Sequence, residues 1–163
     1  MIQPVITAWP QPSEQNGYLA PHIDLLLHSF AHWTGGPLLE PYHQADAAHY
    51  LFHAPFVLVS HNAAPDPVFT YGNRAALELF EMSWKEFTTL PSRRSAESLH
   101  QAERERVLTT VARQGYINSY QGIRIAKSGR RFLIRDAIVW NLIDENERYC
   151  GQAACFKNWS YLE

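Results

Sequence analysis

The stretch from residue 66 to 94 constrains the fold more than any other part of the chain, because it carries strand, turn, helix and stop signals in a fixed order. Residues 68–71 are β-branched and aromatic and predict a short strand. Asn73 follows as a good N-cap for a helix. Ser83 and Glu86 have the spacing of a capping box and predict a second short helix directly after the first.

The segments around this stretch predict an α+β fold. A first strand is expected at 56–60, a helix at 95–114, and three further strands at 119–126, 132–143 and 149–156. Two strands, then helices, then a three-strand meander predict one five-stranded antiparallel sheet with helices on one face.

The first part of the chain predicts a helical extension. Residues 1–20 are polar and rich in proline and are expected to be an irregular arm. Apolar residues then recur at helical spacing from Ile23 to Trp33, and a second short helix is expected at 46–53. We therefore divide the chain into an N-terminal arm and helical extension, 1–54, and a second domain, 55–163.

The run from Tyr71 to Phe87, YGNRAALELFEMSWKEF, resembles the core of the PAS superfamily. The closer resemblance is to the PAS-related MEKHLA domain, which occurs in bacterial single-domain proteins and at the C-terminus of plant class III homeodomain–leucine-zipper factors. The resemblance extends from about Phe56 to Trp159. It implies a sensory or regulatory module whose outer sheet face contacts a second copy or a signalling partner.

Composition excludes several classes of protein. The chain has 163 residues, a net charge of −2 and a pI near 6.4, which argues against a dedicated nucleic-acid binder. No apolar run reaches the roughly 18 residues of a membrane span, and residues 1–16 do not have the pattern of a signal peptide. Cys150 and Cys155 are expected on opposite faces of one strand, unbridged. These features indicate a cytoplasmic protein.

Regular alternation along the strand at 132–143 predicts which residues face a cavity. Phe132, Ile134, Asp136, Ile138, Trp140 and Leu142 would share one face. Asp136 is the only charged residue in that set and would need a partner if it were buried. If the preceding turn runs from Lys127 to Arg131, Arg124 is its diagonal neighbour. The expected ligand-binding residues are Phe69, Leu79, Trp84, Arg124, Ile134, Asp136, Ile138, Trp140 and Gln152.

The opposite face of the same sheet is also apolar. Its expected members are Ile123, Ile125, Leu133, Ala137, Val139 and Ile143. So many apolar side chains need a cover. The cover is either the helix at 23–33 or a second copy of the chain, and a homodimer through this face is one expected assembly.

No cofactor is identified by the sequence. The photosensor branch of the PAS superfamily has a flavin-reactive cysteine where this chain has residues 90–94, which contain none. His100 is the one candidate for a haem ligand in the helical region, and a structural role is favoured for it. His28 and His32, and His49 and His53, have the i,i+4 spacing of metal ligands, but we interpret these pairs as solvated helix faces and expect no metal.

These observations predict a sensory or regulatory module that binds a small ligand in a largely apolar cavity and signals by protein contacts to a separate output protein. The first alternative is a dimerisation or interaction module with a filled core, in which Arg124 and Asp136 pair. The second is a small enzyme that uses Arg124, Asp136 and a histidine as acid–base groups. No hydrolase or phosphate-loop motif is present, so we expect no enzyme, no nucleic-acid partner and no membrane contact.

Overall fold

The computed structural model describes residues 9–163, and the first part of the expected N-terminal arm, 1–8, lies outside the described residues. The strands are β1 (Val57–His61), β2 (Phe69–Gly72), β3 (Tyr116–Ile125), β4 (Arg131–Ile143), β5 (Tyr149–Phe156) and β6 (Asn158–Tyr161). The α-helices are α1 (Ala20–Thr34), α2 (Ala47–His53), α3 (Arg74–Phe80), α4 (Trp84–Phe87) and α5 (Ser98–Gln114). Short 3₁₀ segments are η1 (Glu14–Leu19), η2 (Pro41–Asp46) and η3 (Ser92–Ser95).

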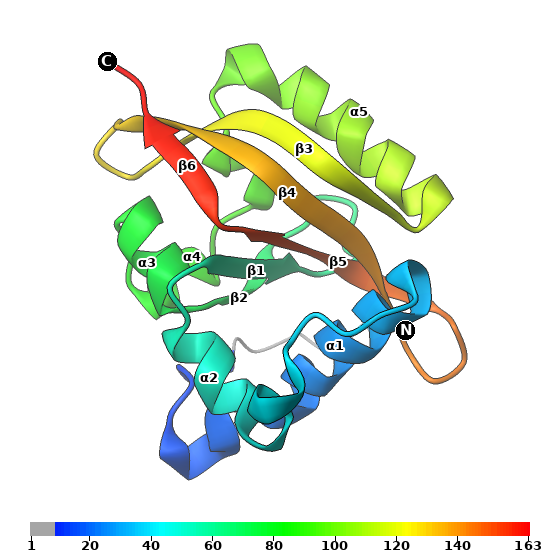
Figure 1. Cartoon of the computed structure of the whole chain (residues 1–163). Coiled ribbons are helices and arrows are strands. Elements are labelled where there is room, and N and C mark those ends of the chain that lie inside the picture. Colours follow the sequence, from blue (N-terminus) through cyan, green and yellow to red (C-terminus); the bar gives the residue numbers. More distant parts are fainter. Residues whose placement is uncertain (1–8) are drawn as a thin grey trace, which may run out of the picture.

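The strands form one antiparallel sheet in the order β2-β1-β5-β4-β3, as Figure 1 shows. The five strands and the α+β class predicted from the sequence are confirmed. The sixth strand, β6, was not predicted. It continues β5 after Lys157 and pairs with the first half of β4, where Leu133 lies opposite Ser160.

Local capping signals are confirmed by the structure. Oδ1 of Asn73 accepts a hydrogen bond from the backbone N–H of Ala76 at 3.1 Å and starts α3. Ser83 and Glu86 form the reciprocal capping box that starts α4. Both signals were readable because each involves residues only three apart.

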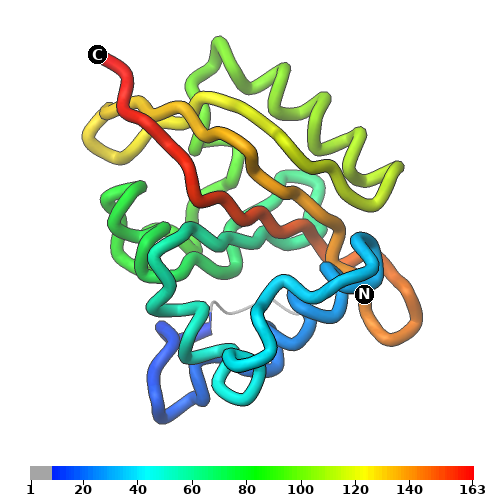
Figure 2. The backbone as a smooth tube through the Cα atoms, in the orientation of Figure 1, coloured from blue at the N-terminus to red at the C-terminus, as the bar shows by residue number. Residues whose placement is uncertain are grey.

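The two faces of the sheet bury two separate apolar clusters. The inner face packs against α3 and α4 through a cluster that includes Val57, Phe80 and Phe132, and α5 lies against β3 and β4 on the same face. The outer face packs against α1 and α2 through a cluster that includes Leu26 and Trp140. Figure 2 shows α5 running beside β3 on one side, and the N-terminal helices on the other.

Helix α1 covers part of the outer face, which is one of the two covers expected from the sequence. The indole N–H of Trp140 donates to the carbonyl of Leu26 at 3.1 Å, and the Phe30 ring meets the same indole edge-on at 5.1 Å. The indole N–H of Trp33 donates to the carbonyl of Asn141 at 2.9 Å. The extension is therefore hydrogen-bonded to the middle of the sheet.

A β-bulge at Asp136 corrects the predicted faces of β4. Gly122 pairs with Ile134 and Tyr120 with Ala137, so β4 carries one more residue than β3 in this interval. Asp136 is the extra residue. Its φ of 54° lies in the left-handed region, which aspartate tolerates better than most residues. The alternation is reversed beyond the bulge.

The prediction that one face runs regularly from Phe132 to Leu142 is therefore wrong from Asp136 onward. Asp136 itself is exposed, and Ile138, Trp140 and Leu142 join the cluster beneath α1 and α2. Ala137 and Val139, which were assigned to the outer face, point inward instead.

The β3–β4 register also differs from the expected one. Arg124 lies opposite Phe132, whereas the expected turn from Lys127 to Arg131 would place Ala126 opposite Phe132. The shift is two residues, which preserves the alternation of side chains. Arg124 therefore still faces inward, as predicted, but its predicted contact with Asp136 does not form.

Candidate functional site

A cavity of about 70 Å³ lies between the inner face of the sheet and helix α5. Strands β1, β3, β4 and β5 supply most of its lining, with side chains from α5 and η3 at one side. Much of the lining is apolar. Its polar members are Ser60, His61, Ser95, Arg104, Tyr120, Arg124 and Gln152.

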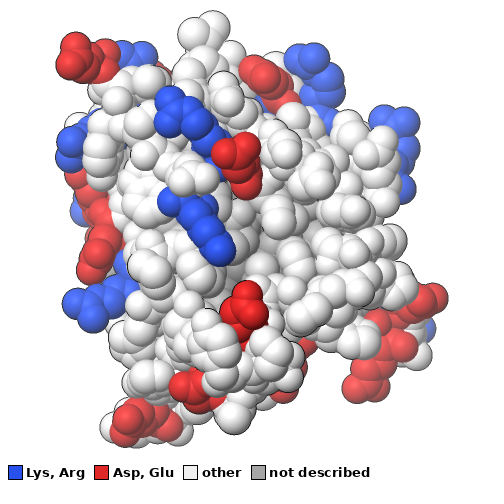
Figure 3. Space-filling view, viewed as in Figure 1, with Lys and Arg blue, Asp and Glu red and all other residues white. Residues whose placement is uncertain are grey.

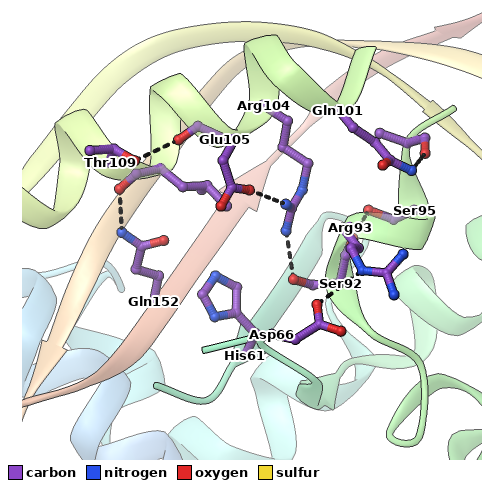
Figure 4. Close-up of polar contacts among 12 residues, drawn as sticks. His61, Asp66, Ser92, Arg93, Ser95, Gln101, Arg104, Glu105, Thr109 and Gln152 are labelled. Carbon is purple, nitrogen blue, oxygen red and sulfur yellow. Dashed lines mark hydrogen bonds and ion pairs between the residues drawn. The ribbon is translucent and has the colours of Figure 1, made fainter. Parts of the chain in front are cut away.

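Arg104 reaches the cavity from α5 and is only 5% exposed. Its Nη2 donates to Oγ of Ser92 at 2.6 Å, as Figure 4 shows. Its acidic neighbour is Glu105, at 3.7 Å from Nη1, but the Glu105 side chain is 72% exposed. Burial, followed by the positive charge of Arg124, lowers the pKa of Arg104 to about 10, so it remains charged at neutral pH.

Arg124 enters the same cavity from β3 and is also buried. Its Nη2 donates to the hydroxyl of Tyr120 at 2.8 Å, and its Nη1 donates to the carbonyl of Ile123 at 2.8 Å. None of the cavity-lining side chains in the described part of the chain is acidic. Two buried guanidinium groups thus face one small space without a buried carboxylate between them.

His61 ends β1 and points from the inner face towards α5 in Figure 4. Its Nδ1 lies 2.8 Å from the carbonyl oxygen of Asn62, which can only accept, so Nδ1 carries the hydrogen. In the neutral ring Nε2 is then an acceptor, and within residues 9–163 it has no hydrogen-bond partner although it is buried. Burial is the largest influence on the pKa of His61 and lowers it, and the nearby Arg104 charge acts in the same direction. The backbone of Asn62 and the side chain of Gln152 act against this shift without reversing it, so the neutral ring is favoured.

Two buried amides attach α5 to the floor of the cavity. The amide of Gln152 donates to the carbonyl of Leu108 at 2.9 Å and to Oδ1 of Asn141 at 3.2 Å. The amide of Asn141 donates in turn to the carbonyl of Val111 at 3.0 Å. Gln152 therefore lies between the cavity and the helix that covers it.

The structure brings together four of the nine residues predicted to bind a ligand. Phe69, Arg124, Ile134 and Gln152 line the cavity, and their role in binding stays a prediction. The other five lie elsewhere. Leu79 is part of the inner-face cluster, and Trp84 packs on Tyr71 and donates to the carbonyl of Trp9 at 2.6 Å.

Asp136, Ile138 and Trp140 lie on the outer side because of the bulge. All three were placed in the cavity by assuming regular alternation. A second pocket on that side, about 440 Å³, is lined by Asp136 and Ile138 together with residues of η2.

Sequence reasoning missed Arg104 and His61. Acidic and basic side chains alternate at 103–106, a pattern that indicates a solvated helix face, but Arg104 is buried. A signal was available, because Arg104, Leu108 and Val111 follow the i, i+4, i+7 spacing of one helix face. His61 offered no comparable signal, since its position depends on how β1 pairs with β5.

The structure gives direct findings on metals, thiols and membranes for residues 9–163. No group of three or more His, Cys, Asp or Glu side chains is arranged to hold a metal ion there. Cys150 and Cys155 are both free, and burial raises the pKa of the Cys155 thiol to about 12. No helix in the described part is long and apolar enough to cross a membrane.

A five-strand antiparallel path with α3, α4 and α5 on its inner face defines a PAS-type domain, and solved structures agree. A PAS domain from Colwellia psychrerythraea superposes with a TM-score of 0.59 at 14% identity, over 72% of this chain and 95% of that one. An RNA-binding light-oxygen-voltage receptor superposes with a TM-score of 0.60 at 15% identity, over 74% of this chain and 34% of that one. Identities this low show the fold alone.

Within that class, the chain belongs to the MEKHLA domain family, whose model matches residues 20–161. Curated relatives are plant homeobox–leucine zipper proteins. ATHB-9 of Arabidopsis thaliana is 29% identical over 99 residues, 59% of this chain and 11% of that protein. ATHB-8 of the same plant is 26% identical over 140 residues, 83% of this chain and 16% of that protein. The chain thus spans only a small part of these relatives.

Proposed function

We propose that this domain is a sensory module that binds a small ligand in the inner cavity and passes the bound state to another protein. Membership of a PAS-related family supports a sensory role. The observation that supports a ligand is the polar lining of the cavity. Arg104 and Arg124 are buried in a lining that contains no acidic side chain, since the Glu105 carboxylate near Arg104 is exposed, and Nε2 of His61 is buried without a donor. Buried polar groups of this kind are costly unless something pairs with them.

Two hydrogen-bonded links run from the cavity to α1 and support a route for the signal. In β1, His61 faces the cavity while the adjacent Ser60 accepts or donates at 2.8 Å to the ring of His22 in α1. In β4, the side chain of Asn141 accepts a hydrogen bond from the amide of Gln152. The backbone carbonyl of Asn141 accepts a hydrogen bond from the indole N–H of Trp33 in α1, at 2.9 Å. A ligand that moves the inner groups would bias the position of α1.

The outer side of the domain is the proposed contact for an output protein or a second copy. In Figure 3, charged side chains are sparse in the right-hand area between α5 and the loop after β4. Cores of protein interfaces are likewise poor in charge. A cytoplasmic location, and the division into an extension at 1–54 and a domain at 55–163, remain part of this proposal. The family match begins at residue 20, inside the extension.

Native mass spectrometry and an absorbance spectrum, on protein purified without refolding, test the proposal. A stoichiometric added mass that is lost on mild activation supports a sensor. An apo mass in every preparation, with no mass gained from a metabolite extract, would contradict it. The same spectra report the oligomeric state and so test the homodimer.

A ligand-free interaction module is the second proposal, and the size of the cavity favours it. A volume of about 70 Å³ is well below the roughly 300–1,000 Å³ of sites for drug-sized ligands. This volume leaves only small molecules as ligands. The acid–base arrangement considered for an enzyme is not assembled, because Asp136 is exposed on the opposite side from Arg124 and His61.

A further inference from the structure

We infer that the cavity binds a short hydroxy carboxylate, such as glycolate or lactate, with its carboxylate between Arg104 and Arg124 and its hydroxyl on Nε2 of His61. This inference rests on the proposed sensory function and names the ligand class for it. Three independent features of the cavity carry it: charge, hydrogen-bonding polarity and size.

The two positive charges of the cavity lining favour an anionic ligand. Each guanidinium has five N–H donors and is planar, which suits a carboxylate. The hydrogen bonds found use one donor of Arg104, to Ser92, and two of Arg124, to Tyr120 and Ile123. All three acceptors are neutral. A monoanion between the two arginines would supply the charge that the lining lacks, and charge-assisted hydrogen bonds of this type are the strong ones.

The acceptor at Nε2 of His61 favours a ligand that also carries a hydrogen-bond donor. Nδ1 of His61 already donates to the carbonyl of Asn62, so Nε2 offers a lone pair. A simple carboxylate has no hydrogen to give to that lone pair, whereas a hydroxyl beside the carboxylate has one. A hydroxy acid therefore matches the two arginines and the histidine together.

Size and lining restrict the rest of the molecule. A cavity of about 70 Å³ admits only a compact molecule of a few non-hydrogen atoms. Apolar side chains, among them Phe69, Ile134 and Phe156, cover the remaining wall. A methyl group suits that wall, but a second charge or a long chain does not.

On the α5 side, three side chains separate the cavity from an outer groove. Arg104, Tyr120 and Arg124 line the cavity and also line an outer groove of about 200 Å³. These three side chains therefore form the wall between the two spaces. The hydrogen bond from Arg124 to Tyr120 lies in that wall, so a movement of the Arg124 guanidinium towards a carboxylate would open it.

Isothermal titration calorimetry of the full chain tests the inference with three probes. Lactate is expected to bind. Propionate, which lacks the hydroxyl, is expected to bind roughly tenfold more weakly because Nε2 of His61 stays unpaired. Methyl lactate, which lacks the charge, is expected not to bind. Equal binding of lactate and propionate would overturn the role of His61, and binding of methyl lactate as tight as that of lactate would overturn the role of the arginines.

Matched variants locate the site. Arg124→Gln and Arg104→Gln should each weaken lactate binding by about a hundredfold or more, whereas Arg106→Gln, on the same helix but exposed, should leave it unchanged. Ala154→Leu keeps both arginines and fills the cavity, so it should also abolish binding. Thermal melts confirm that each variant is folded. Lactate binding that survives Ala154→Leu in a folded protein would place the site elsewhere and overturn the inference.

Failure of this inference is distinguishable from failure of the proposed function. If native mass spectrometry finds a different bound molecule, and lactate and glycolate do not displace it, the inferred ligand class is wrong but the proposed sensory function is still supported. If no hydroxy acid binds and no other mass is found, both are wrong and the ligand-free module is favoured.

Discussion

Asn73 shows how one residue can hold several elements together. It is fully buried, and its side chain makes four hydrogen bonds. Oδ1 accepts from the backbone N–H groups of Leu58 and Ala76, both at 3.1 Å. Nδ2 donates to the carbonyls of Leu51 and Phe56, at 2.9 Å and 2.8 Å. These partners belong to α2, the segment after it, β1 and α3, so an amide is required here and no other side chain supplies the same set.

We expect Asn73→Ala to lower the free energy of unfolding by about 3–5 kcal/mol, because it removes a helix cap and all four hydrogen bonds from the side chain to buried backbone groups. Urea denaturation measures this loss. Ser83→Ala is the matched control, since it removes a cap from an exposed helix end, and it should cost about 1 kcal/mol. Equal losses in the two variants would show that the buried network adds nothing beyond the cap.

The backbone conformation of Gly151 leads to a second prediction about a single residue. Its φ is 140°, and a Cβ built on it would lie 2.1 Å from the carbonyl oxygen of His61. Gly151→Ala should therefore lower the free energy of unfolding by more than about 3 kcal/mol, since the obstacle is backbone. Gly129→Ala also has a positive φ but meets nothing within 4 Å, and should cost about 1–2 kcal/mol. A loss no larger at Gly151 than at Gly129, in matched chemical denaturation curves, would contradict the close contact.

At the scale of elements, the sequence predicted what depends on neighbours in the chain and missed what depends on pairing between strands. The caps at Asn73 and Ser83 are local and were correct. The bulge at Asp136 depends on the difference in residue count between β3 and β4, which no local pattern reveals. The burial of Arg104 likewise depends on where α5 lies on the sheet, so an Arg in a charged run was interpreted as solvated.

The bulge gives a prediction for β4. Asp136 is exposed and has φ = 54°, so Asp136→Gly should raise the free energy of unfolding or leave it unchanged, within about 1 kcal/mol, by relieving the left-handed conformation. Asp136→Val should lower it by about 1–2 kcal/mol, because a β-branched residue is poorly tolerated at positive φ. Equilibrium denaturation of both variants measures the difference. If the two variants have the same stability, the strand does not have the bulge.

At the scale of the whole molecule, buried polar groups lie on either side of β1, between α1 and the inner cavity. His22 of α1 is enclosed by Ser60, Tyr71 and the ring of Trp9, and His61 faces the cavity one residue after Ser60. Burial lowers the pKa of His22 from 6.5 to about 4 and lowers that of His61. Both histidines are neutral in the folded protein at neutral pH, so the two sides of the sheet share a sensitivity to acid.

The sign of the pH dependence follows from these shifts. Below pH 6.5 the unfolded chain binds a proton at His22 while the folded chain does not, so the free energy of unfolding falls with falling pH until about pH 4. The full loss from His22 is about 3 kcal/mol at 1.36 kcal/mol per pKa unit, and His61 adds to it in the same direction. Most of this window lies above 4.5, the ordinary pKa of glutamate, so carboxylates contribute little there.

Urea denaturation at a series of pH values between 7 and 4.5 measures this slope. His22→Gln should flatten the curve, because glutamine does not titrate, and the remaining slope then belongs to His61. His28→Gln, on the exposed side of the same helix, should leave the slope unchanged. Binding of a hydroxy acid at His61 would add a second signature, since a ligand bound only to the folded state raises stability in proportion to its occupancy. A slope that is unchanged in His22→Gln would show that His22 is not buried beneath the sheet, and α1 would then not be coupled to the cavity through Ser60.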